Sequence, residues 1–146
     1  MKIDTLMVQA LAIVLMLGLV VTAQAQSLDI KPGLWEKRVT METGGRTVMD
    51  STIEACLTAD DLNLKKTAEK LARLPSCKVL QQDLSRKTLT VVLRCTEVLA
   101  ESTTEVRSRD SMFVTATLKP TGGGEVTHSR EEWSFLKADC GKRTAS

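Results

Sequence analysis

The side chains able to do acid–base or nucleophilic chemistry are few, because the chain has one histidine, four cysteines and no tyrosine. His128 is the one imidazole available as a general base, and two acids, Glu131 and Glu132, follow it closely. A general base needs a nucleophile and normally an orienting carboxylate within reach. The two glutamates are neighbours on an expected strand, so they point to opposite faces and cannot converge. We therefore expect His128 to be a solvent-facing strand residue.

Two further patterns resemble catalytic motifs only in part. Ser134 and Lys137 match the S-x-x-K string of serine penicillin-binding enzymes, but the S-D-N and K-T-G elements of those enzymes are absent. Asp60 and Asp61 are explained by the first turn of a helix, where acids are favoured. No phosphate loop, dinucleotide fingerprint, H-E-x-x-H or calcium loop occurs. We expect no catalytic residue, no metal ligand, no cofactor and no enzymatic activity.

The four cysteines are best explained as two disulfides. Cys56, Cys77, Cys95 and Cys140 contain no C-x-x-C pair, which argues against zinc. Four cysteines allow three connectivities, and the sequence alone does not decide among them. A hairpin centred on Arg86 would set Cys77 opposite Cys95, near enough for a bond, which leaves Cys56 for Cys140. In the loop-entropy account these bonds are worth about 3 and about 4–5 kcal/mol.

The first residues are typical of a secretory signal peptide. An apolar run, Val8–Val21, precedes the small residues Ala23 and Ala25, which predicts cleavage between Ala25 and Gln26. As a helix this run spans roughly 21 Å, short of a hydrocarbon core of about 30 Å, which disfavours the alternative of an uncleaved anchor. We expect a cleaved signal peptide at 1–25, a single small disulfide-stabilised domain at 26–146, no later transmembrane segment, and a periplasmic or secreted location where disulfides persist.

The elements that must position these residues are mostly strands. Hydrophobic residues make up 42% of the chain, and the net charge of +2 gives no electrostatic reason to expect nucleic acid as a partner. Alternating patterns and turn signals predict one helix at 59–73, with Thr58 before it as N-cap. The expected strands are 34–43, 46–55, 77–84, 88–95, 98–107, 112–119 and 125–135. This pattern predicts an α+β, mainly β fold: a curved antiparallel meander sheet with one inserted helix.

Two hairpin registers are predicted, the first by keeping acids off one face of the sheet and the second by folding the chain about Arg86. In the first, a three-residue Gly44–Arg46 loop with a glycine bulge pairs Met41 with Met49, Val39 with Ser51 and Trp35 with Ala55. In the second, a three-residue turn at 85–87 pairs Val79 with Leu93, Gln81 with Val91 and Asp83 with Leu89. Trp35 and Trp133 are expected to be buried anchors rather than a ligand-stacking surface.

A combination of short motifs resembles that of a known family. Lys31-Pro32-Gly33-Leu34-Trp35-Glu36, then Cys56-Leu57-Thr58, Cys77, Cys95 and Asp139-Cys140-Gly141 resemble a bacterial secreted family catalogued as domain of unknown function 3617. The resemblance covers about residues 30–141. It implies export by Gram-negative bacteria and small size, and it carries no established activity or catalytic residues.

These observations favour a non-enzymatic exported binding module. Because one helix covers only part of a curved sheet, the uncovered face is expected to take an apolar small molecule or an envelope partner. The alternative is an inhibitor-type or envelope-stress protein that docks on another protein through loops such as 121–125. A hydrolase with an unrecognised site, using His128, Ser134 or the paired acids, is the third hypothesis.

Overall fold

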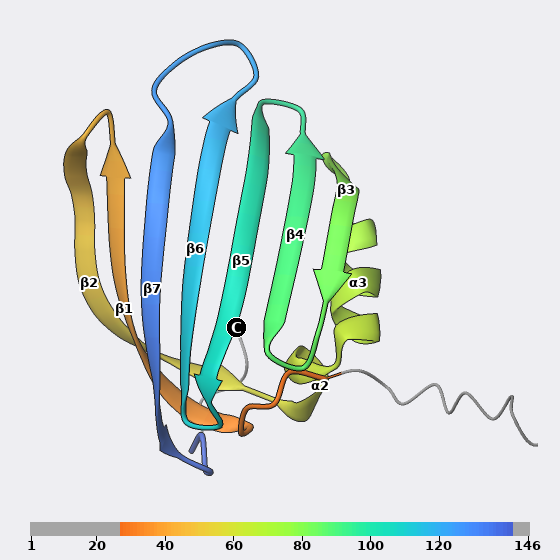
Figure 1. Cartoon of the computed structure of the whole chain (residues 1–146), viewed down its shortest axis with the longest axis vertical. Helices are drawn as coiled ribbons and strands as arrows, with labels where there is room; N and C mark the ends of the chain where they lie inside the picture. The colour runs from red at the N-terminus through yellow and green to blue at the C-terminus, as the bar shows by residue number, and fades with distance from the viewer. Residues whose placement is uncertain (1–26, 142–146) are drawn as a thin grey trace, which may run out of the picture.

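The computed structural model describes residues 27–141, so the expected signal peptide and its cleavage site at Ala25–Gln26 lie outside the described residues. Seven strands form one sheet (Figure 1). They are β1 Gly33–Thr43, β2 Arg46–Leu57, β3 Cys77–Leu84, β4 Thr88–Cys95, β5 Val98–Ser108, β6 Ser111–Pro120 and β7 Thr127–Lys137. Two helices, α2 Ala59–Leu62 and α3 Leu64–Ala72, lie between β2 and β3 in the chain.

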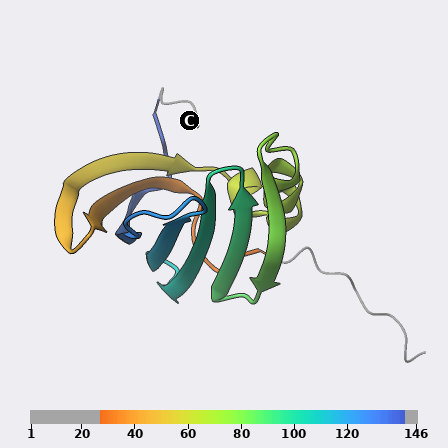
Figure 2. The ribbon, with the colours of Figure 1, turned by 90° about the horizontal axis from the view of Figure 1, so that it is seen from above.

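The sheet order is β2-β1-β7-β6-β5-β4-β3, with every neighbouring pair antiparallel. Strands β3 to β7 form a meander, and the N-terminal β1–β2 hairpin is added to it because β1 pairs with β7. The expected mainly β, antiparallel fold is thus confirmed. Figure 2 shows that the sheet is strongly curved but not closed, which leaves β2 and β3 as its two edges.

The register predicted for β1 and β2 is confirmed, with Trp35 opposite Ala55 and Met41 opposite Met49. The predicted three-residue loop is wrong. Gly44 and Gly45, with φ of 57° and 76°, form a two-residue turn, a conformation that glycine adopts without a Cβ penalty. Val48 is the extra residue of a β-bulge, and this bulge restores the alternation that a tight turn alone would have lost.

The β3–β4 hairpin follows the predicted register only at its open end. Cys77 faces Cys95 and Val79 faces Leu93, as predicted. A bulge at Leu80 then shifts the pairing by one residue, so the predicted pairs Gln81–Val91 and Asp83–Leu89 are wrong. Gln82 faces Val91 and Leu84 faces Leu89 instead. The shift places a leucine rather than a carboxylate opposite Leu89, which packs against the core.

The single helix predicted at 59–73 is two helices. Asn63 between them has an extended backbone, with φ −80° and ψ 110°, and its side chain accepts a hydrogen bond of 3.2 Å from the backbone N–H of Lys66. This bond caps α3, so the asparagine ends one helix and begins the next. Helix α2 begins at a capping box made by Thr58 and Asp61.

The core lies where the helices and the N-terminal segment meet one face of the sheet. Trp35 is fully buried, its indole N–H donates to the carbonyl of Lys31 at 3.0 Å, and its ring meets Phe135 edge-on at 5.5 Å. Around it gather buried apolar side chains from the lead-in, the helices and the central strands: Leu28, Ile30, Leu62, Leu64, Val106 and Met112. Trp35 is therefore a buried anchor. We call this side of the sheet the core face and the opposite side the outer face.

Within residues 27–141, neither helix has the length and apolar character needed to cross a membrane.

Candidate functional site

A pocket of about 250 Å³ lies on the outer face of the sheet. Its walls are side chains of three adjacent strands: Arg38, Thr40 and Glu42 of β1, Phe113 of β6, and His128, Arg130 and Glu132 of β7. The register sets Arg38 opposite Glu132 and Glu42 opposite His128. Alternate residues of these strands point to the outer face, away from Trp35, so the pocket does not communicate with the core.

The charges around this pocket are only partly neutralised by neighbours. Arg38 reaches out to Asp50 of β2, with its guanidinium 3.4 Å from a carboxylate oxygen. The hydroxyl of Thr117 lies 3.3 Å from Nδ1 of His128. Among residues 27–141, the side chains of Glu42, Arg130 and Glu132 contribute neither to a hydrogen bond nor to an ion pair. The pocket therefore offers a polar molecule both acceptors and donors.

The structure does not bring together the residues that the sequence offers as candidates for catalysis. Glu131 and Glu132 point to opposite faces, as their positions on a strand require. Ser134 is exposed on the outer face, and its direct neighbours across the sheet are Glu36 and Ser111. Within residues 27–141, His128 has a threonine hydroxyl but no carboxylate within hydrogen-bond distance. No group of three or more potential metal ligands occurs in the described part of the chain.

A second polar group lies on the core face, where sequence reasoning gave no signal for it. Lys37 lies 4.0 Å from Glu131 and 4.9 Å from the centre of the Trp133 ring. The indole N–H of Trp133 donates to the other oxygen of Glu131 at 2.8 Å. Each polar group in this cluster has a partner within the cluster, so the cluster stabilises the half-buried Trp133 rather than presenting free groups to a ligand.

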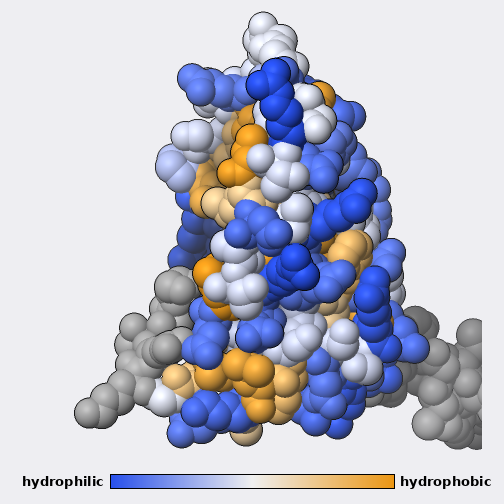
Figure 3. All heavy atoms as spheres, turned by 90° about the vertical axis from the view of Figure 1, so that its left-hand side faces the viewer, coloured by the Kyte–Doolittle hydropathy of each residue, from blue (hydrophilic) through white to orange (hydrophobic). Residues whose placement is uncertain are grey.

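Among residues 27–141, half of the large hydrophobic residues that are exposed lie on the edge strand β2. Val48, Met49 and Ile53 are 60%, 46% and 47% exposed, respectively, although all three are large hydrophobic residues. We call these three residues the β2 patch. Figure 3, which faces this side of the molecule, shows apolar side chains interspersed among polar ones. Because β2 is the last strand of the sheet, the backbone on its free side has no strand to pair with.

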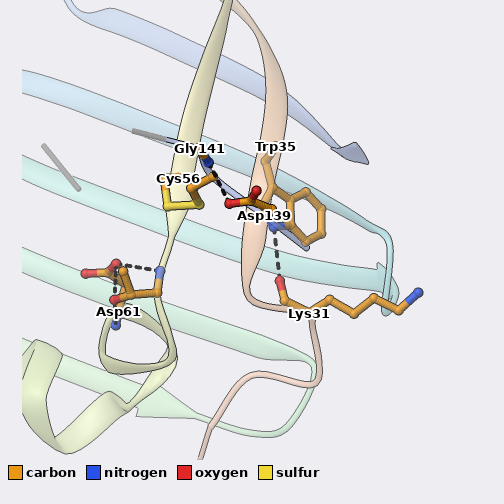
Figure 4. Close-up of a disulfide and its surroundings, with 8 residues drawn as sticks. Lys31, Trp35, Cys56, Asp61, Asp139 and Gly141 are labelled. Atoms are coloured by element: carbon orange, nitrogen blue, oxygen red, sulfur yellow. Dashed lines mark hydrogen bonds between the residues drawn. A yellow bond between two sulfur atoms is a disulfide. The ribbon is translucent and has the colours of Figure 1, made fainter. Parts of the chain in front are cut away.

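The lower end of β2 is fixed by a disulfide. Cys56 is bonded to Cys140 in the segment after β7, and the turn of that segment is held by a 2.8 Å hydrogen bond from the N–H of Gly141 to Asp139 (Figure 4). The second disulfide joins Cys77 to Cys95, and no described cysteine is free. The pairs are those favoured by the hairpin argument. Both edge strands therefore carry a disulfide.

One titratable group next to β2 is perturbed. The hydroxyl and backbone N–H of Thr58 donate to the Asp61 carboxylate at 2.7 and 2.8 Å. These bonds lower the pKa of Asp61 from its ordinary value of 3.8. Figure 4 shows Asp61 at the start of α2, where it holds the helix next to the end of β2. Asp60 and Asp61 are thus helix-start acids, and Asp61 has a capping role.

Comparisons with known proteins give a family and a distant structural similarity. The model of the family "Protein of unknown function (DUF3617)" matches residues 30–140. No curated protein matches the chain. Among solved structures, the chain is similar to an S-type phycobiliprotein lyase of Guillardia theta, at 13% identity and a TM-score of 0.37, over 73% of this chain and 88% of that one.

Proposed function

We propose that this chain, which belongs to the DUF3617 family of proteins of unknown function, is a non-enzymatic exported module that binds a polypeptide partner at the β2 edge. The partner would add an extended strand to β2 and cover the β2 patch. Main-chain hydrogen bonds supply affinity in this mode of binding, and side chains on alternate positions supply specificity.

The observation that carries this proposal is the exposure of Val48, Met49 and Ile53 along an edge strand that pairs on one side only. Natural sheets protect long edges with lysines, prolines or a covering element. Strand β2 has 12 residues, and neither lysine nor proline is among them. A scattered exposed apolar residue needs no explanation, but three on one free edge are typical of an interaction site.

Export rests on separate support. The apolar run before Ala25 predicts a signal peptide at 1–25, and two formed disulfides are typical of an oxidising compartment. We therefore place the mature domain, 26–146, in the periplasm or outside the cell. An intact mass of the exported protein tests this: the proposal requires a chain that begins at Gln26 and has no reactive thiol.

The docking proposal is tested with a synthetic 12-residue peptide that has the sequence of β2, with serine in place of Cys56. The probe is added to the purified mature protein, and amide hydrogen exchange is followed by mass spectrometry. We expect slower exchange across 49–53 and no change in β3. The variant Ile53→Lys should lose this protection, whereas Leu80→Lys, a change of the same kind on the β3 edge, should keep it.

Unchanged exchange in β2 at saturating peptide, in protein kept monomeric by dilution, would contradict the proposal. Equal protection of β2 and β3 would also contradict it, because the peptide would then bind any free strand.

The outer-face pocket supports a second candidate, the binding of a small polar molecule. The apolar ligand expected from the sequence does not suit this pocket, because Arg38, Arg130, Glu42 and Glu132 line it. Side chains of both signs fit a zwitterion, and free amino acids are the probes. We expect chemical-shift changes at His128 and Arg130 on titration, with Arg130→Ala weakening binding. The absence of any shift at these residues would exclude this candidate.

A further inference from the structure

We propose that the strand added at β2 is the β2 strand of a second copy of this chain, in a two-fold dimer whose axis passes through Ser51. This inference rests on the proposed function, since it names the partner of the same edge. Of the registers in which β2 can pair with itself, this one covers Met49 and Ile53 of the β2 patch without placing like charges directly opposite each other.

Geometry limits the choices. Residues directly opposite each other in an antiparallel pair lie on the same face of the sheet. From Met49 onward, the odd-numbered residues of β2 lie on the core face, because Met49, Ser51 and Ala55 face Met41, Val39 and Trp35. A two-fold antiparallel pairing that keeps the core face continuous must therefore centre on a residue of β2, which faces its own copy.

Charge removes two of the central registers. An axis at Asp50 would set that carboxylate against its own copy, and an axis at Thr52 would set Asp50 against Glu54 of the second chain. Like charges directly opposite each other destabilise a strand pair.

Local structure removes the registers on either side. An axis at Ile53 would set Asp50 of the second copy against Cys56, only three residues from the axis, where the disulfide to Cys140 ties the C-terminal segment to β2. An axis at Met49 would set the bulge residue Val48 against Asp50 directly beside the axis, and it would leave Ile53 facing Gly45 of the turn.

The axis at Ser51 centres the pairing on 49–53, between the Val48 bulge and the disulfide at Cys56. It places Met49 opposite Ile53 of the second copy, twice by symmetry, so each half-exposed apolar side chain covers another. On the outer face it places Asp50 opposite Thr52, with no acid directly facing an acid. The two Asp50 side chains are then diagonal neighbours, and each has an Arg38 guanidinium 3.4 Å away to offset the repulsion.

A two-fold pair also closes the assembly. Pairing β2 with β3 of the next copy would instead generate an open chain of molecules. Strand β3 resists this, since α3 packs beside it, a bulge interrupts it at Leu80, and Lys78 stands on it (Figure 2).

The test uses single cysteines introduced into the mature protein with both native disulfides intact. Under mild oxidation, Ser51→Cys should give a covalent dimer of twice the monomer mass, because position 51 faces its own copy. Thr52→Cys is the matched control: it lies one residue away on the other face, does not face its own copy, and should give little covalent dimer. Ile53→Cys tests the neighbouring register.

The outcomes separate this inference from the proposed function. Dimers formed mainly through position 52 or 53, or a ladder of higher species, would overturn the two-fold register. A monomeric wild-type protein whose β2 is still protected by the β2 peptide would overturn the dimer and leave strand addition standing. A monomer that also fails to bind the peptide would overturn both.

Discussion

The two edges of the sheet are built in opposite ways. Strand β3 has 8 residues, carries Lys78 and a bulge, and has helix α3 beside it. Strand β2 has 12 residues, no lysine, and three large hydrophobic side chains exposed to solvent. Figure 2 shows α3 at the β3 end of the curved sheet and no described helix along the upper part of β2. The β3 edge is thus protected against pairing with another strand, whereas much of β2 is not.

The contrast teaches that the exposure of β2 is not a general property of this small sheet. Both edge strands have a bulge, but only β3 has a helix packed beside it and a lysine on the strand. Because exposed strand edges promote unwanted pairing, an unprotected edge with apolar residues costs solubility unless a partner covers it. This is the physical argument for a docking role at β2.

The largest expected effect on the free energy of unfolding comes from the disulfides at the two edge strands. Removing the Cys56–Cys140 bond by Cys56→Ala with Cys140→Ala should lower the free energy of unfolding by about 4–5 kcal/mol, because it closes a loop with a separation of 84 residues. Removing Cys77–Cys95, with a separation of 18, should cost about 3 kcal/mol. Urea unfolding of both double variants measures the difference. A larger loss at the β3 edge would show that chain entropy does not set the order.

The next effect compares a side chain of the covered region with one of the open edge. Leu64→Ala in α3 should lose about 2–5 kcal/mol, since this leucine is almost fully buried in the core. Ile53→Ala on β2 should change the free energy of unfolding of the monomer by only about 0.5 kcal/mol. Denaturation at low protein concentration keeps association out of the comparison. An equal loss at both positions would mean that Ile53 is packed within its own chain.

A smaller effect is expected at the capping box that begins helix α2. Thr58→Ala should cost about 0.5–2 kcal/mol of unfolding free energy, as is usual for the loss of an N-cap side chain. The lowered pKa of Asp61 means that its contribution is fully present above the ordinary value of 3.8 and is lost as the pH falls through the lower folded value.

The difference in stability between wild type and Asp61→Asn should therefore shrink when unfolding is measured at acidic pH. A difference that grows on acidification would contradict the cap as described.

Much of the fold could be predicted from alternation and turn residues. Gly44-Gly45 and the Cys77–Cys95 spacing indicate hairpins, and the clean alternation of 112–118 predicts a strand. What could not be predicted is what depends on packing between distant elements. The bulges at Val48 and Leu80 have no local signal, because each corrects which side chains face the core. The pairing of β1 with β7 likewise joins segments almost a hundred residues apart.

The surface was harder to predict than the fold. Alternation puts Met49 on the same face as Trp35, but it does not show which part of that face the helices cover. The backbone of α2 lies next to β2 and that of α3 next to β3, and Met49 and Ile53 of β2 stay about half exposed. The outer-face pocket also depends on register, since Arg38, His128 and Phe113 come from strands that the sequence does not show to be neighbours.

Sedimentation of three mature proteins at the same concentration tests the role of the β2 edge most directly: wild type, Ile53→Lys and Leu80→Lys. The account predicts that the wild type and Leu80→Lys sediment with the mass of two chains and that Ile53→Lys sediments with the mass of one. A dimer that survives Ile53→Lys but is lost in Leu80→Lys would show that the wrong edge has been assigned.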